Sequence, residues 1–179
     1  LGTAVNEKTQ DRSVAQSVVD EIKAVGGDAI VNGDDIATMA GGKSVVEAAM
    51  DVFGRVDILI NNAGVARPKV IYEMTEDEWD LVVDVSLKGA FVMARQASPI
   101  MIRQKSGVII NTSSTSGLGH YGNSIYSAAK EGLVGFSRSV ARHLGHYGVR
   151  CNAIRPLGIS RLATAEMMET LRISQEDFG

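Results

Sequence analysis

The chain has 179 residues, of which 45% are hydrophobic and 22% are charged, and its formal net charge is −3. This composition is typical of one globular domain with a substantial core. It excludes a strongly basic surface for nucleic acid, and no apolar run is long enough to cross a membrane. The single cysteine, Cys151, cannot form an internal disulfide, so we expect a reducing, cytoplasmic location.

Helices and strands alternate along the chain. From the spacing of apolar residues we expect a helix over 14–25, a strand over 29–32, a helix over 45–53, a strand over 56–60, a long helix after Thr75, a strand over 108–110, a helix over 124–147, a strand over 149–154 and a helical tail over 163–179. Thr75 and Glu78 have the spacing of a capping box, and Pro99 is expected to bend or end the long helix. This alternation predicts an α/β fold with a doubly wound, Rossmann-like parallel sheet.

Tyr126 and Lys130 are four residues apart, so they share one face of the predicted helix. A phenol with an ordinary pKa of about 10 is a poor acid–base catalyst at neutral pH, but an ammonium nearby favours the phenolate. By itself this pair is weak evidence, because such pairs often arise by chance on a solvated helix face.

Three strand motifs give the pair its context. The stretch from Gly107 to Ser114 is a buried strand that ends in hydroxyls, where ligands bind in open α/β sheets. The strand before it runs into two amides and a glycine at 61–64, and the strand after it ends at Pro156.

In order and spacing, these motifs resemble the short-chain dehydrogenase/reductase family over essentially the whole chain. The resemblance implies an NAD(P)-dependent oxidoreductase in which Tyr126 is the catalytic acid/base. Lys130 would lower the pKa of Tyr126 and bind the nicotinamide ribose, and Ser114 would hydrogen-bond the substrate oxygen. Strict counting from Tyr126 nominates Ser113 instead, whereas a one-residue deletion in the loop 117–123 keeps Ser114; we choose Ser114.

The same resemblance implies a cofactor site. Asp34 and Ile36 would flank the adenine, and the chain from Pro156 to Ile159 would pass the nicotinamide. The other residues expected to bind NAD or NADP are Asn62, Ala63, Gly64, Tyr126 and Lys130. We favour NAD, although the residue that decides between the two falls in a segment absent from this sequence.

Two departures from the family pattern stand out. Ser86 replaces the asparagine whose backbone carbonyl supports a water-mediated proton relay, and a serine at this position retains that carbonyl. The glycine-rich turn and the first two strands are missing, so residues 1–179 read as one truncated dinucleotide-binding domain. In the family's strand order, 3-2-1-4-5-6-7, the missing strands would leave a gap of about 15 Å. We therefore expect further residues before Leu1, and no stable, cofactor-competent fold for residues 1–179 alone.

Two other patterns are discounted. Residues 117–122 fit G-x-G-x-x-G but lie between the serine and the tyrosine, and no acidic residue follows at the required distance, so we expect an active-site loop there. His143 and His146 are three residues apart without further ligands, and we expect no metal site.

The stretches 77–80, 88–91 and 156–161 resemble the (3R)-hydroxyacyl-CoA dehydrogenase units of multifunctional enzymes and bacterial 3-oxoacyl reductases. This makes a 3-hydroxyacyl or 3-oxoacyl thioester the leading substrate of an alcohol–ketone interconversion. The alternative is a catalytically silent family member that acts as a scaffold or oligomer subunit. We also expect a homodimer or homotetramer, because several residues of the helix over 126–147 are small, namely Ala128, Gly132, Gly135, Ser139 and Ala141.

Overall fold

The computed structural model describes residues 12–156, and the chain divides into two units after Asp35. In the first unit, helix α1 (Arg12–Ala24) ends before the glycines at 26–27, as predicted. The strand expected over 29–32 is not formed, because residues 12–35 contain no other strand to which its backbone could hydrogen-bond.

The second unit is built on a parallel sheet. Strands β1 (Ile58–Asn61), β2 (Gly107–Thr112) and β3 (Val149–Ile154) lie in the order β1-β2-β3. Ile60 pairs with Ile110, and Ile110 pairs with Asn152 on its other side. All three strands were predicted within a few residues, and the α/β fold with a parallel sheet is confirmed.

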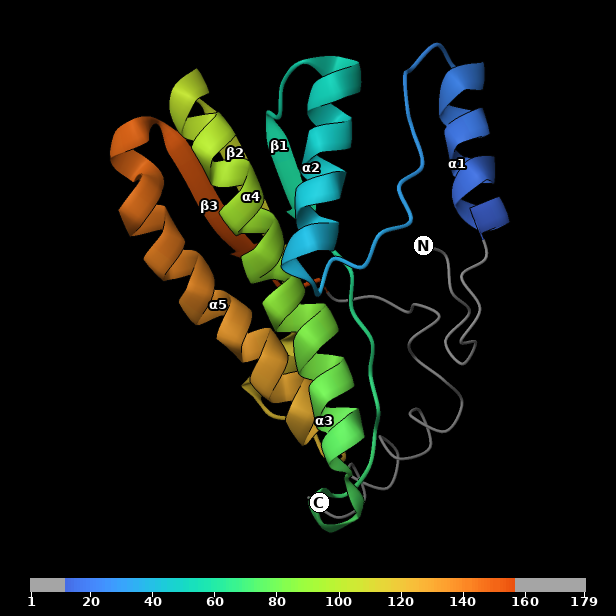
Figure 1. Ribbon diagram of the computed structural model, residues 1–179. Coiled ribbons are helices and arrows are strands. Elements are labelled where there is room, and N and C mark those ends of the chain that lie inside the picture. The colour runs from blue at the N-terminus through green and yellow to red at the C-terminus, as the bar shows by residue number, and fades with distance from the viewer. Residues whose placement is uncertain (1–11, 157–179) are drawn as a thin grey trace. The chain divides into compact units, whose positions relative to one another are not determined.

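Within residues 36–156, four α-helices accompany the sheet, and α4 and α5 lie over the same face of it (Figure 1). They are α2 (Met39–Phe53), α3 (Glu76–Val83), α4 (Gly89–Gln104) and α5 (Ser124–Leu144). Helix α3 begins with the predicted capping box, in which Thr75 and Glu78 satisfy each other's backbone amides. Helix α2 ends at Gly54, which takes the left-handed conformation (φ 73°) that favours glycine.

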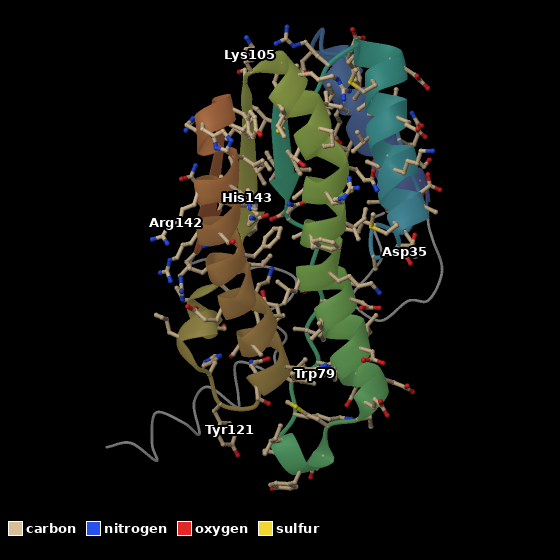
Figure 2. All side chains as sticks on the ribbon, turned by 60° about the vertical axis from the view of Figure 1, so that its left-hand side comes forward. Asp35, Trp79, Lys105, Tyr121, Arg142 and His143 are labelled. Atoms are coloured by element: carbon tan, nitrogen blue, oxygen red, sulfur yellow. The ribbon has the colours of Figure 1, made fainter. Side chains whose placement is uncertain are left out.

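Helices α3 and α4 form one long column joined by a wider, π-helical turn (Asp84–Lys88), with Trp79 and Lys105 toward its two ends (Figure 2). The column continues past Pro99 to Gln104, so of the two outcomes expected at this proline the end of the helix is wrong, and the bend stays a prediction. The column has an irregularity at the π-helical turn, a feature that often accompanies functional sites.

Two apolar clusters hold these elements together. The larger lies between the sheet and α4, and its buried members include Met93, Ala97, Met101, Ile109, Val149 and Cys151. The smaller joins α3 to the first turns of α5 through Val82, Ile125 and Ala129. Successive side chains of a strand point to opposite faces, so Ile58 and Ile60 point away from the larger cluster and are more than half exposed. The core therefore lies on the helix-covered face.

Within residues 12–156, no helix is long and apolar enough to cross a membrane. The helical tail expected over 163–179 lies outside the described residues.

Candidate active site

The site is assembled where β2 ends and α5 begins. Ser114 follows two residues after β2, and Tyr126 lies in the first turn of α5. The Ser114 side chain lies close enough to the phenol to lower its pKa by hydrogen bonding. The fold therefore brings the two hydroxyls of the sequence prediction close together.

The neighbouring hydroxyls of Ser113 and Ser114 point to different surroundings. The Ser113 hydroxyl is buried and donates to the backbone carbonyl of Lys130 at 2.6 Å. The Ser114 side chain instead accepts from the backbone amide of Ser116 at 3.1 Å and lies beside Tyr126. Of the two candidates that the sequence left open, Ser114 is the one that meets the phenol.

Lys130 is almost completely buried beneath Tyr126. Its Nζ donates to the backbone carbonyl of Thr112 at 2.7 Å and lies 5.5 Å from the centroid of the Tyr126 ring. Burial lowers the pKa of Lys130 to about 8. The structure thus places an ammonium near the phenol, in a site that strongly disfavours its charge.

The pKa of Tyr126 is raised, mainly because burial disfavours the phenolate, and the hydrogen bond with Ser114 offsets part of this rise. This is opposite to the direction expected from the ammonium of Lys130. The cost of removing the phenolate from water is larger than the stabilisation that the Lys130 ammonium provides, because this ammonium is hydrogen-bonded to the Thr112 carbonyl.

Gly64 and Ser86 complete the surroundings of the Lys130 ammonium. A Cβ on Gly64 would lie 3.2 Å from Lys130 Nζ and 3.5 Å from Ser86 Oγ, so a larger residue would press on both groups. Ser86 is 2% exposed and lies in the π-helical turn, and its hydroxyl has no hydrogen-bond partner among the described residues. An unsatisfied buried hydroxyl is costly, so this atom is a point where a ligand or water is needed.

A cavity of about 250 Å³ opens beside this cluster, and Ser86 lines it. Three of the residues predicted to bind cofactor also line it, namely Ile36, Asn62 and Ala63. Its walls combine apolar side chains, such as Val45 and Met93, with a few polar groups, which suits a flat heteroaromatic ring. These residues fit part of a nicotinamide dinucleotide.

For three other predicted cofactor residues, the structure does not test the expected role. Asp34 belongs to the first unit. Pro156 lies two residues after the end of β3, and Ile159 lies outside the described residues. Residues 12–156 contain no cluster of His, Cys, Asp or Glu that could hold a metal ion.

Sequence reasoning missed a buried amide network under the site. Asn61 donates to the Asn111 side chain at 2.8 Å, and Asn111 donates to the Ser137 hydroxyl at 2.8 Å. These bonds connect β1, β2 and α5 at Asn111, the residue of β2 that directly precedes Thr112. The signal was present, because a polar residue inside an otherwise apolar parallel strand needs a buried partner.

The model of the short chain dehydrogenase family matches residues 3–172, so the chain belongs to this family. The fold agrees with this assignment. A short chain dehydrogenase from Mycobacterium avium has a TM-score of 0.76 and 42% identity, covering 79% of this chain and 52% of that one. An NAD+-bound xylitol dehydrogenase has a TM-score of 0.80 and 26% identity, covering 84% of this chain and 60% of that one.

Two curated relatives illustrate the kinds of protein that the chain matches. The peroxisomal hydratase-dehydrogenase-epimerase of Saccharomyces cerevisiae is 44% identical over 163 residues, covering 90% of this chain and 18% of that protein. The 3-oxoacyl-[acyl-carrier-protein] reductase of Synechocystis is 39% identical over 148 residues, covering 82% of this chain and 60% of that protein. The chain thus spans less than two thirds of either relative.

Proposed function

We propose that this protein is an NAD(P)-dependent oxidoreductase that interconverts a secondary alcohol and a ketone. The observation that carries the proposal is the grouping of the Ser114 and Tyr126 side chains around the buried ammonium of Lys130, which lies 5.5 Å from the centre of the Tyr126 ring. A phenol, a second hydroxyl and a cation together can bind a carbonyl oxygen and exchange a proton with it.

In ketone reduction, the Tyr126 hydroxyl donates its proton to the substrate oxygen, and Ser114 donates a hydrogen bond to the same oxygen. The raised pKa keeps Tyr126 protonated at neutral pH, as this step requires. Lys130 then stabilises the phenolate that remains. In alcohol oxidation, the phenolate takes the proton back. The nicotinamide, when bound, supplies or accepts the hydride at the substrate carbon.

Ser86 has two groups that could serve the return of the proton to Tyr126. Its backbone carbonyl corresponds to the one that the family's usual asparagine provides, and its own buried hydroxyl is unsatisfied within the described chain. We propose that Ser86 supports this return. The absence of the family's asparagine side chain at this position would then not abolish activity.

The cofactor would be held along the 250 Å³ cavity by Ile36, Asn62 and Ala63, with Gly64 next to Lys130. By resemblance, Asp34 would flank the adenine, and the chain from Pro156 to Ile159 would pass the nicotinamide. We propose NAD rather than NADP, and the NAD+-bound state of the xylitol dehydrogenase neighbour supports a nicotinamide cofactor.

The proposed substrate is a 3-hydroxyacyl or 3-oxoacyl thioester, because the relatives include a protein named as a 3-oxoacyl-[acyl-carrier-protein] reductase. Other relatives are named as peroxisomal, so the cytoplasmic location stays a prediction that imaging of the tagged protein would decide.

We also propose a homodimer or homotetramer formed through α4 and α5. Between these helices lies a surface cavity of about 490 Å³, lined by apolar groups including Phe91 and Phe136. His143, visible with Arg142 on α5 in Figure 2, also lines it. Gly132, expected to keep this surface small, instead packs within the subunit, where a Cβ would lie 3.0 Å from Leu87. A monomeric mass in light scattering at micromolar concentration would contradict this proposal.

The activity is tested by following the absorbance of reduced nicotinamide with the full-length protein. A 3-oxoacyl thioester should be reduced with NADH, and more slowly with NADPH, whereas Tyr126→Phe should be inactive. Cofactor binding without turnover on any thioester or secondary alcohol would favour the silent scaffold. Absence of cofactor binding would contradict the proposal altogether.

A further inference from the structure

An ion pair connects α5 to the end of β3. Arg155 Nη2 lies 2.5 Å from the carboxylate of Glu131. Glu131 directly follows Lys130 on α5, and Arg155 lies between the last residue of β3 and Pro156. The pair therefore joins the helix of the proposed acid/base to the strand whose exit was predicted to pass the nicotinamide.

The turn that carries Ser114 rests on this ion pair. Gly117 lies in the turn over Thr115–Leu118, and its backbone amide donates to the Ser114 carbonyl at 3.1 Å. A Cβ on Gly117 would lie 3.1 Å from Glu131 Oε2 and 3.4 Å from Arg155 Nη1, so the backbone of the turn packs directly on the two charged groups.

Enclosure distinguishes this pair from an ordinary surface ion pair. The Arg155 side chain is 25% exposed and the Glu131 side chain 46%, against 64% and 60% for the two partners of the Lys43–Glu47 pair on α2. Arg155 Nη1 is fully buried without a hydrogen-bond partner in residues 12–156. Because it is enclosed, the Arg155 side chain has fewer accessible rotamers than a solvent-exposed arginine. Its ion pair with Glu131 therefore holds the guanidinium in one position.

We propose that the Glu131–Arg155 ion pair is a positioning element that holds the turn after β2 so that the Ser114 hydroxyl stays against the Tyr126 hydroxyl. The inference rests on the proposed function for its catalytic consequence, whereas its geometric part concerns this contact alone. Neither residue touches the reacting groups. Both act through Gly117 and the turn over Thr115–Leu118.

Glu131→Gln removes the charge while keeping the shape, and Glu47→Gln on α2 is the matched control. With saturating cofactor and thioester, we expect the Glu131→Gln variant to lose about tenfold in kcat, since small misplacements of reacting groups are costly. The dissociation constant for NADH should stay within about twofold, because the cofactor cavity is not lined by the pair. The charge-reversed double variant Glu131→Arg/Arg155→Glu should recover part of kcat, which a general loss of stability would not allow.

A second readout does not depend on activity. Tyr126 can be titrated in protein carrying ring-labelled tyrosine by NMR, its signal being assigned with Tyr126→Phe. Lys130 of its own helix and Ser114 of the turn are the described groups that face it, and the Ser114 hydrogen bond lowers its pKa. Displacement of the turn in Glu131→Gln should therefore raise the pKa of Tyr126. Glu47→Gln should leave it unchanged.

Gly117→Ala provides a variant in which both charged residues are retained. Its methyl group would displace the turn from the ion pair, so it should reproduce the lower kcat and the raised Tyr126 pKa. An unchanged Tyr126 titration in both Glu131→Gln and Gly117→Ala would overturn the inference. If the parent protein turned over no substrate, the proposed function would fail, and the titration would still decide whether the ion pair positions Ser114.

Discussion

Replacement of Lys130 by methionine should separate catalysis from stability. The variant keeps the length of the side chain but removes a buried ammonium whose pKa is lowered from 10.5 to about 8. The difference between these two pKa values corresponds to about 3 kcal/mol by which the folded protein is destabilised when Lys130 is charged. Loss of the hydrogen bond to the Thr112 carbonyl opposes this by about 1.5–3 kcal/mol. At pH 7 we therefore expect a variant at least nearly as stable as the parent, although inactive.

The pH dependence gives the sharper test. Between pH 8 and 10.5, Lys130 is protonated in the unfolded chain and largely neutral in the folded one, so the parent gains stability as the pH rises. Below pH 8 both states carry the proton, and the destabilisation is constant. The contribution of Lys130 to the free energy of unfolding should thus increase by about 2 kcal/mol from pH 7 to 9.5. The Lys130→Met variant should lack this increase.

Urea denaturation followed by circular dichroism at pH 7 and 9.5 measures this difference in the full-length protein. Other groups titrate over the same range, so the quantity to compare is the free energy of unfolding of the parent minus that of the variant. Lys43→Met, on the exposed side of α2, is the control and should show no such change. A parent-minus-variant difference that is constant within about 0.5 kcal/mol would refute the assigned burial of Lys130.

Four further substitutions test other parts of the site. Tyr126→Phe should lower kcat by at least about a thousandfold while NADH affinity, measured by fluorescence, stays within twofold; turnover within a few-fold of the parent would contradict its acid/base role. Ser114→Ala should lower kcat by about a hundredfold at unchanged melting temperature, whereas Ser113→Ala should cost about 1 kcal/mol of stability and spare kcat; the reverse pattern would exchange their roles. Asn111→Leu should destabilise the protein by about 2–4 kcal/mol in urea titrations, since Asn61 and Ser137 lose a buried partner; a smaller change would mean that water replaces the amide.

Local sequence patterns predicted the elements whose causes are local. The apolar spacing of α1 and α5, the capping box at Thr75 and the glycine after α2 all act within one or two turns. The strand over 29–32 was not found, because a strand depends on a neighbour that its own residues do not specify. The helix does not end at Pro99 for a related reason, since the packing of α4 on the sheet outweighs the loss of one helical hydrogen bond.

The site also has features that local sequence predicts and features that only the three-dimensional structure reveals. The four-residue spacing of Tyr126 and Lys130 fixed their common face, and the structure retains it. The choice between Ser113 and Ser114 required the geometry after β2, which turns the two hydroxyls toward different partners. Glu131 and Arg155 are 24 positions apart in the sequence, so no short motif could predict their contact.

The π-helical turn at Asp84–Lys88 also sets the rotational phase between the two halves of the helical column. A π-helical turn holds one residue more than a regular α-helical turn, and each residue of an α-helix turns the chain by about 100°. Deletion of one residue here would restore a regular helix and rotate α3 relative to α4. With α4 held on the sheet by Met93 and Met101, Val82 would then turn away from Ile125 and Ala129. The extra residue thus lets one column present one side to the sheet and another to the start of α5, with Ser86 at the point of change.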